Sequence, residues 1–392
     1  MRYFKIALIS IFILIFISAC VFINQEKAPK KGFIEDLTTS KNSMLSYVDK
    51  KELALLAQKI KEHRDLKIRI YGDSHMAADF FSRELRKIFI KVNAIGFVYP
   101  LQPKYQQALT LNYQYKNFEL LNSKSDTYEN YPMGGIVAKA INKGAFIRLQ
   151  SNLNTQKFNV AFLFKSMQKT PSFKIEDAKG KSFILKTELT NKWTLKEFKD
   201  INFPIQITAL EKDVALGGYF IKNEKDNVIL DTLGVNGARS DLWTKWDIDI
   251  FEDELKLIQS DLNILAYGSN DALFGVFDKD KFKNNYKNFI KILRKNNPNT
   301  SILLISPPTV TQKKDEVYVL NENFYNIRQA IYELAKEEKT LLFDMHNFME
   351  NTGSKNTWIE NNLSLQDVHL SISGYELMAD KFYKDLKEVV GF

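Results

Sequence analysis

Ser74 has the residue type and the position of a nucleophile. It lies in the segment Gly72-Asp73-Ser74-His75, directly after an apolar strand predicted over residues 66–72. A helical pattern follows, so we expect Ser74 at a strand-to-helix turn, where free N–H groups of the first helical turn attract negative charge. Ligands of open parallel sheets bind at such strand ends. Asp73 and Ser74 are equally suited to capping a helix, and this segment alone leaves both interpretations open.

Two later segments offer hydrogen-bond donors for an anion. Residues 234–238 (GVNGA) and 268–271 (GSND) each follow a predicted strand. A glycine lets a ligand approach its N–H group closely, and an asparagine side chain donates without carrying charge. An oxyanion hole needs donors of these kinds. Turn geometry alone would also explain each glycine.

Two of the four histidines follow an aspartate at the same spacing. The two segments are Asp344-Met345-His346 and Asp367-Val368-His369. A neutral imidazole can take the proton of a serine hydroxyl, and a neighbouring carboxylate can orient that imidazole. His346 is expected at the end of a strand, and His369 in the loop before a final helix. The spacing by itself does not choose between them.

Strands and helices are predicted to alternate over most of the chain. Short apolar strands are expected over 66–72, 228–234, 262–268, 301–308 and 340–345, and helices over 40–65, 76–90, 247–259, 282–295, 321–338 and 374–390. This alternation indicates a parallel sheet with helices on both faces, the α/β class.

Residues 109–227 have a different pattern. Apolar and polar residues alternate over 157–165 and 182–189, which predicts half-buried strands. We therefore predict a discontinuous α/β domain over 31–108 and 228–392. A β-rich insertion over 109–227, expected to be a sandwich, interrupts it.

The N-terminus has the features of an export signal. Arg2 and Lys5 precede an apolar run over 6–19, and the single cysteine of the chain, Cys20, follows it. Residues 17–20 resemble a bacterial lipobox, which implies a lipidated Cys20 and a membrane tether. The apolar stretch continues to residue 23, so an uncleaved anchor is the alternative. Residues 1–30 are thus interpreted as signal or anchor, and the rest of the chain as exported and periplasmic.

The composition is that of a folded protein. The 392 residues are 45% hydrophobic and 26% charged, with a formal net charge of +8. Most of the 55 basic residues are lysines. Base reading relies mainly on arginine and amide side chains, so we expect no nucleic-acid partner.

Four segments together resemble the SGNH (GDSL-type) hydrolases. These are GDSH around Ser74, the segment with Gly237, GSND with Asn270, and Asp367 with His369, in the family's order. The resemblance implies a three-layer αβα sandwich with a flavodoxin-like parallel sheet. It also implies Ser74 as nucleophile, His369 as base and Asp367 as the carboxylate that orients it. The oxyanion hole would comprise the N–H groups of Ser74 and Gly237 and the Asn270 amide, with no metal or organic cofactor.

One position departs from the family pattern. SGNH hydrolases usually carry the acidic residue three positions before the histidine, where this chain has Gln366. The nearest carboxylate, Asp367, is only two positions before His369. Asp344 is therefore kept as an alternative residue to orient the imidazole.

Within that superfamily the chain resembles the peptidoglycan O-acetylesterases. The features in common are His75 after the serine, the NGA sequence at 236–238, the exported N-terminus and the β-rich insertion. The resemblance implies removal of acetyl from the C6 hydroxyl of N-acetylmuramic acid in O-acetylated peptidoglycan. It also implies that the insertion resembles a carbohydrate-binding module.

Three other functions are left open. A peptidoglycan O-acetyltransferase would use the same residues. A metal-dependent phosphoesterase would use Asp73 with His75, and Asn270 with Asp271, as ligands. A non-catalytic glycan-binding lipoprotein would stack sugars on aromatic side chains of the insertion, although strand packing also explains these aromatics. They are Tyr113, Tyr115, Phe118, Tyr128 and Tyr131.

Overall fold

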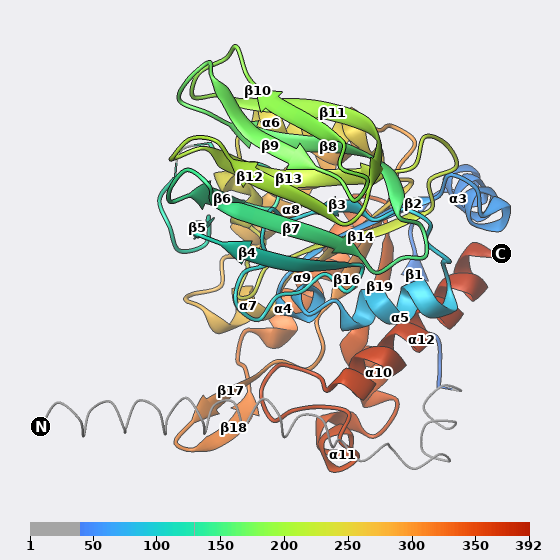
Figure 1. Cartoon of the computed structure of the whole chain (residues 1–392). Coiled ribbons are helices and arrows are strands. Elements are labelled where there is room, and N and C mark those ends of the chain that lie inside the picture. The colour runs from blue at the N-terminus through green and yellow to red at the C-terminus, as the bar shows by residue number, and fades with distance from the viewer. Residues whose placement is uncertain (1–39, 129) are drawn as a thin grey trace, which may run out of the picture.

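The computed structural model describes residues 40–128 and 130–392, so the predicted signal or anchor over 1–30, including Cys20, lies outside the described residues. A six-stranded sheet runs through the molecule (Figure 1). In spatial order its strands are β1 (Met44–Ser46), β19 (Leu341–Asp344), β16 (Ser301–Ser306), β15 (Leu262–Ala266), β2 (Lys67–Gly72) and β14 (Ile229–Gly234). β1 pairs antiparallel with β19, and the other neighbours pair parallel.

The strand order places a switch point beside β2. The chain runs from β2 to β14 on one side and then returns to β15 on the other side. A crevice forms where successive connections leave in opposite directions, and α/β proteins bind ligands there. The Val235 N–H donates to the Gly72 carbonyl, and the Asp73 N–H to that of Ala266. The ends of these three strands therefore meet at one edge of the sheet.

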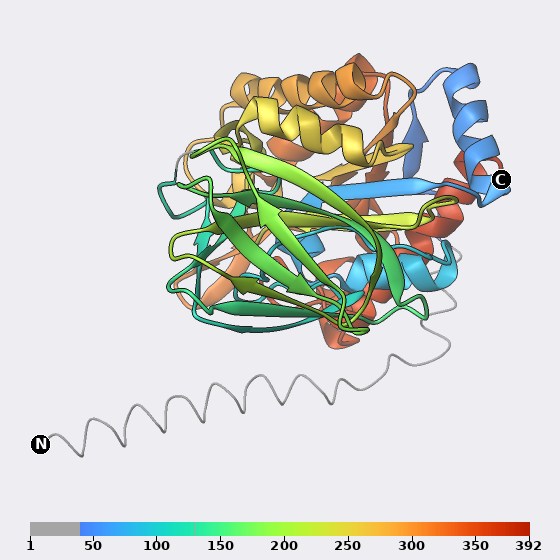
Figure 2. The same ribbon diagram turned by 45° about the horizontal axis from the view of Figure 1, so that its top comes forward.

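Helices pack on both faces of this sheet. One face carries α6 (Ile248–Leu257), α8 (Lys279–Asn296) and α9 (Phe324–Glu337), and the other carries α3 (Lys50–Glu62), α5 (Phe80–Ile88) and α12 (Ile372–Val390) (Figure 2). Successive residues of β2 show the division, because Ile70 packs in the core beneath α5 and α12 while Tyr71 packs beneath α6 and α8. The shorter helices are α4 (Ser74–Ala77), η2 (Leu242–Lys245), α7 (Ser269–Leu273), α10 (Met345–Glu350) and α11 (Ser354–Glu360).

Two antiparallel sheets occupy the region between β2 and β14 in sequence. The first comprises β10 (Ser182–Lys186), β9 (Pro171–Glu176), β12 (Ile205–Ala209), β7 (Phe146–Ser151) and β4 (Leu111–Lys116). The second comprises β11 (Trp193–Asn202), β8 (Lys157–Lys165), β13 (Ala215–Lys222), β6 (Ile136–Ala140) and β5 (Phe118–Asn122), with β3 (Gly96–Val98) paired to β13. A buried cluster containing Phe162, Ile175 and Ile207 lies between the two sheets. A separate hairpin comprises β17 (Thr311–Lys314) and β18 (Val317–Leu320).

The prediction that strand 157–165 is half buried was wrong. Every residue of β8 after Lys157 is buried. Phe158, Val160, Phe162 and Phe164 face the core between the antiparallel sheets, as their alternation indicates. Ala161 and Leu163 point the other way and pack in the core shared with the α/β part. Both faces are apolar because the insertion lies against the rest of the molecule. Over 182–189, Leu189 lies beyond β10 and is exposed, so it does not share a face with buried Leu185.

Two predicted helices are interrupted. Within 40–65 the structure has the strand β1 first, and α3 begins only after Asp49, whose side chain accepts from two N–H groups of the first turn. Pairing with the edge of β19 outweighs the local helical pattern there. Within 76–90, α4 and α5 are separated at Asp79, which has a φ of 62°.

A buried ion pair joins the sheet to the β-rich region. The Arg69 guanidinium on β2 donates to both carboxylate oxygens of Asp231 on β14, each at 2.7 Å. Asp231 also accepts from the Phe97 N–H of β3. β3 pairs with β13 of an antiparallel sheet, although it lies in the stretch 31–108 that was predicted to be part of the α/β domain. The boundaries between the two predicted domains stay a prediction. In residues 40–128 and 130–392, no helix has the length and apolar content needed to span a membrane.

Candidate active site

Ser74 lies at the strand-to-helix turn predicted for it. It is the first residue of α4, directly after β2. Asp73 is the N-cap, and its carboxylate accepts from the His75 N–H at 3.0 Å. α4 lies tightly on the end of β14, since a Cβ added at Gly234 would be 2.3 Å from the Ala77 backbone nitrogen. Glycine at 234 therefore permits the close approach that holds Ser74 at this edge.

Ser74, His369 and Asp367 form one hydrogen-bonded relay. The Ser74 Oγ lies 3.0 Å from the Nε2 of His369, and the His369 Nδ1 lies 3.0 Å from the Asp367 Oδ2. The other Asp367 oxygen accepts from the His369 N–H at 2.9 Å. With Nδ1 donating to the carboxylate, Nε2 is free to accept the serine hydroxyl proton. Residues 295 positions apart in sequence are thus in bonding distance.

The electrostatics of this relay favour a basic imidazole. Burial works against the charged form of His369, but the hydrogen bond and charge of Asp367 outweigh it, so the pKa of His369 is raised above its ordinary 6.5. For Asp367, burial is likewise outweighed by the contacts with His369, and the pKa of its carboxyl is lowered. The buried Lys355 ammonium donates to the Asp367 carbonyl, and burial lowers the pKa of Lys355 to about 8.

The predicted oxyanion donors lie just beyond the carboxyl ends of β2, β14 and β15. Within the described part of the chain, the N–H groups of Ser74 and Gly237 have no hydrogen-bond acceptor. Gly237 has a φ of 74°, a conformation that favours glycine. The Asn270 side chain is buried and donates from Nδ2 to the Ala238 carbonyl at 2.9 Å. That bond uses one amide hydrogen and leaves the second available.

Two residues that contact the Gly237 loop were not predicted from the sequence. The Gln106 side chain donates to the Gly234 carbonyl and accepts from the Asn236 N–H. The Lys124 ammonium, from the turn after β5, donates to the Asn236 carbonyl at 3.1 Å. A Cβ at Gly237 would lie 2.3 Å from that ammonium. One lysine among many offered no sequence signal for this contact.

His75 is buried next to the ring of His369. Its Nδ1 lies 2.9 Å from the Tyr375 hydroxyl and its Nε2 lies 2.9 Å from the Ser269 hydroxyl. Burial and the neighbouring His369 and Lys355 lower the pKa of His75 well below its ordinary value. Burial raises the pKa of Asp73 to about 7. A neutral His75 thus links Tyr375 of α12 to Ser269 of α7 through its two ring nitrogens.

Asp344 and His346, the alternatives to Asp367 and His369, contact other residues. The Asp344 carboxylate contacts Arg328 and Tyr332 and accepts from the Asn347 N–H, and His346 contacts Thr309.

Among residues 40–128 and 130–392, no group of three or more histidine, cysteine or acidic side chains is arranged to hold a metal ion.

The aromatic residues proposed for sugar stacking are mostly covered. Phe118 and Tyr131 are buried, and Tyr113 and Tyr128 are half-buried. Tyr115 alone among the five is largely exposed, at 57%. Strand packing therefore accounts for most of this set.

Comparison with known proteins agrees with this architecture. Residues 213–377 match the GDSL-like Lipase/Acylhydrolase family, and residues 94–206 match the family "Peptidoglycan O-acetylesterase, N-terminal". A comparison with curated proteins found no match.

A solved structure of a peptidoglycan O-acetylesterase has the same fold. It is 24% identical, with 89% of this chain and 99% of that one covered and a TM-score of 0.76. An acetyl xylan esterase is 23% identical over 40% of this chain and 79% of its own, with a TM-score of 0.32. A family two carbohydrate esterase from Clostridium thermocellum is 13% identical over 71% and 99%, also with a TM-score of 0.32. The two family matches identify the chain as an esterase that combines a GDSL-like lipase/acylhydrolase domain with a peptidoglycan O-acetylesterase N-terminal domain.

Proposed function

We propose that the protein is a serine esterase that removes O-acetyl groups from cell-wall glycan, and specifically from the C6 hydroxyl of N-acetylmuramic acid in peptidoglycan. The observation that carries this proposal is the relay from Ser74 through His369 to Asp367, with both contacts at 3.0 Å. The match of residues 94–206 to the peptidoglycan O-acetylesterase N-terminal family supports the choice of polymer. The helices on both faces of the sheet would make a three-layer αβα core, and residues 109–227 a carbohydrate-binding insertion.

The proposed reaction is a double displacement. The Ser74 oxygen attacks the acetyl carbonyl carbon while His369 Nε2 takes the hydroxyl proton. The C–O bond to the sugar then breaks, and the sugar oxygen leaves with that proton. Water attacks the acetyl-serine, again giving its proton to His369. Acetate departs, and the proton returns to the Ser74 oxygen.

Asp367 and the proposed oxyanion donors have separate proposed roles. The Asp367 carboxylate holds the proton on Nδ1 and stabilises the imidazolium formed in each step. The N–H groups of Ser74 and Gly237, which have no acceptor within the described residues, would bind the tetrahedral oxyanion together with the Asn270 amide. Such donors act more strongly on the oxyanion than on the ground-state carbonyl, so they accelerate the chemical step.

The proposed setting is the periplasm, with the catalytic part tethered through lipidated Cys20 or an uncleaved N-terminal anchor. Residues 1–30 carry this part of the proposal by sequence alone. Radiolabelled fatty-acid incorporation tests it: label on wild type but not on Cys20→Ala supports lipidation, and no label on either supports the uncleaved anchor.

The esterase proposal is tested by acetate release from O-acetylated peptidoglycan, with acetylated xylan as the comparison polymer. We expect wild type to release acetate faster from peptidoglycan and Ser74→Ala to release none above background. Ser182→Ala, at an exposed serine of β10, is the matched control and should retain wild-type release. Full activity of Ser74→Ala would contradict the mechanism. Acetyl transfer to an added glycan in place of acetate release would identify a transferase.

A further inference from the structure

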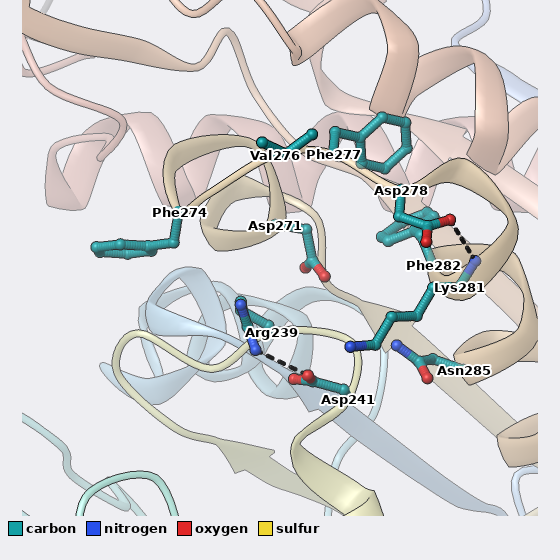
Figure 3. Close-up of a pocket in the computed structure, with 10 residues that line it drawn as sticks. All are labelled: Arg239, Asp241, Asp271, Phe274, Val276, Phe277, Asp278, Lys281, Phe282 and Asn285. Atoms are coloured by element: carbon teal, nitrogen blue, oxygen red, sulfur yellow. Dashed lines mark hydrogen bonds and ion pairs between the residues drawn. The ribbon is translucent and has the colours of Figure 1, made fainter.

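A charged pocket lies between the loop that carries Gly237 and the short helix α7, which carries Asn270. Its volume is about 80 Å³, and a single water needs roughly 10–15 Å³ by the same measure, so it has room for a small polar group. Arg239 and Asp241 follow Gly237 on that loop, and Asp271 follows Asn270 within α7 (Figure 3). The remaining wall is formed by residues 274–278 and the first turns of α8.

The Gly237 loop and α7 are joined directly by hydrogen bonds. Asn270 donates to the Ala238 carbonyl, and the next residue, Asp271, accepts from the Ser240 hydroxyl at 2.7 Å. Asn270 and Asp271 are adjacent, and the residues they contact on the loop, Ala238 and Ser240, are two positions apart. The pocket thus shares the 237–241 loop and α7 with two of the proposed oxyanion donors, Gly237 and Asn270.

Side chains of both charges line the pocket. The cations are Arg239 and Lys281, and the carboxylates are Asp241, Asp271 and Asp278. Arg239 and Asp241 form an exposed ion pair at 2.8 Å. In Figure 3 the Lys281 side chain extends toward Asp241. The Lys281 ammonium has no hydrogen bond or ion pair to any residue in the described part of the chain.

This charge pattern selects against simple ions. A phosphate or sulfate entering the pocket would meet three carboxylates, and a metal ion or polyamine would meet two cations. Each like-charge contact costs binding free energy, so the pattern discriminates by repulsion as well as by attraction. A group that carries one positive and one negative charge a few ångströms apart satisfies both sets. The exposed Phe274 and Val276, the latter 99% exposed, add apolar surface at the rim.

We propose that this pocket binds a free amino-acid end, with an ammonium and a carboxylate on one carbon, of the peptide attached to the cell-wall glycan. The ligand carboxylate is placed at Lys281 and Arg239, and the ligand ammonium at Asp241 and Asp271. The inference rests on the proposed function, because the peptide stems of peptidoglycan are the source of such ends. Binding there would position the acetylated sugar of the same repeat at Ser74.

Three matched ligands test the charge requirement. Isothermal titration with Ser74→Ala, which cannot turn over an ester, would use a stem peptide with a free zwitterionic diamino-acid end, the same peptide N-acetylated at that end, and the same peptide with the carboxylate amidated. We expect each blocked peptide to bind about tenfold or more weakly than the free one, because one charge-assisted contact is lost. Equal binding of all three peptides, or no binding of any, would overturn the proposal.

Two lysine variants on α8 locate the contact. Lys281→Met, made in the Ser74→Ala background, should weaken binding of the free peptide about tenfold and remove the effect of amidation. Lys291→Met removes an equivalent exposed charge from the same helix, outside the residues that line the pocket, and should bind like the parent. Circular dichroism checks that both remain folded. Equal binding by Lys281→Met and Lys291→Met would place the peptide elsewhere.

The kinetic test separates this inference from the esterase proposal. The ratio of kcat/KM for O-acetylated glycan with stems to that for glycan without stems should fall about tenfold in Lys281→Met. An unchanged ratio would refute the stem site while leaving the esterase proposal intact. If wild type hydrolyses neither glycan nor a chromogenic acetate ester, the esterase proposal fails, and the titrations still decide whether the pocket binds the amino-acid end.

Discussion

The two Asp-x-His segments, 344–346 and 367–369, have the same spacing and different environments. Asp367 binds its own histidine twice, through the backbone N–H and the imidazole Nδ1. Asp344 instead points toward α9, where it accepts from the Arg328 guanidinium at 2.7 Å and the Tyr332 hydroxyl at 2.6 Å. The direction of the carboxylate, which spacing does not define, therefore separates the two segments.

The two histidines differ accordingly in basicity. His346 is buried against the rings of Phe324 and Tyr325, with centroids 4.8 and 5.9 Å away, and burial lowers its pKa to about 4. His369 is 38% exposed in its side chain and has a raised pKa. The first is a packed, neutral core residue and the second is suited to exchange protons near neutral pH.

The largest expected difference is between the two histidine variants. His369→Ala should lower kcat for acetate release on the order of 10⁵-fold or more, as loss of the base does in other serine hydrolases. His346→Ala should retain most activity and lower the free energy of unfolding by about 1–3 kcal/mol, because it leaves a cavity between the two rings. Steady-state kinetics with urea denaturation measures both. Equal losses of activity would remove the distinction.

Variants of the two aspartates should differ in the same way, with a smaller effect on kcat than the histidine variants have. Asp367→Asn is expected to lower kcat on the order of 10⁴-fold at nearly unchanged stability, because it no longer holds the proton on Nδ1. Asp344→Asn should cost about 1–3 kcal/mol of stability, since Arg328 loses its buried charged partner. Should Asp344→Asn instead have the catalytic defect, the orienting carboxylate has been misassigned.

Removing one oxyanion donor should have a smaller effect still. Asn270→Ala is expected to lower kcat by roughly 10²–10³-fold, about 2.7–4 kcal/mol, with little change in KM. Asn263→Ala, at a buried amide on the neighbouring strand β15 that bonds Thr300, is a matched control for loss of a buried asparagine. A rise in KM without a fall in kcat would place Asn270 outside the oxyanion site.

The pH dependence of kcat/KM is the smallest expected effect, and its direction follows from the pKa of His369. His369 must be neutral to accept the serine proton, so kcat/KM should rise with pH and level off above its raised pKa. The stability contribution has the opposite sign. Because folding favours protonated His369, that contribution is present below an unfolded pKa of about 6.5 and is lost as pH rises through the folded pKa.

Substituting the aspartate of each Asp-x-His segment tests which of them sets the pH dependence of kcat/KM. Asp367→Asn should shift the midpoint of kcat/KM to lower pH, because the carboxylate that raises the pKa of His369 is gone. Asp344→Asn should leave the midpoint in place. A profile measured with a chromogenic acetate ester from about pH 5 to about pH 9 covers the ordinary histidine range. A midpoint that moves with Asp344 and not with Asp367 would contradict the account.

The sequence predicted the parallel strands well because each is a short apolar run whose residues are buried on both faces. The turn position of Ser74 and the loop position of His369 were also predicted, since each lies at a recognisable boundary of an element, and their catalytic roles stay predictions. Residues 44–46 were misassigned because their strand depends on the distant edge of β19. The second buried face of β8 likewise depends on a neighbour that the strand's own alternation does not reveal.

The surroundings of the candidate site were predicted less completely. Gln106 and Lys124 contact the Gly237 loop from more than a hundred residues away, and neither belongs to a motif. The pairing of Asp367 with His369 could be proposed from sequence, but only the loop conformation shows that a two-residue spacing lets the carboxylate reach Nδ1. Long-range contacts and side-chain direction are the parts that local pattern does not contain.

The central claim is that Ser74 carries the acetyl group during turnover, and trapping that intermediate tests it most directly. Wild-type enzyme mixed with a chromogenic acetate ester, quenched in acid during the burst phase and digested, should give an acetylated peptide that contains Ser74. The same peptide from Ser74→Ala should be unmodified. Acetylation at another residue, or turnover with no acetylated peptide at any time, would contradict the serine mechanism.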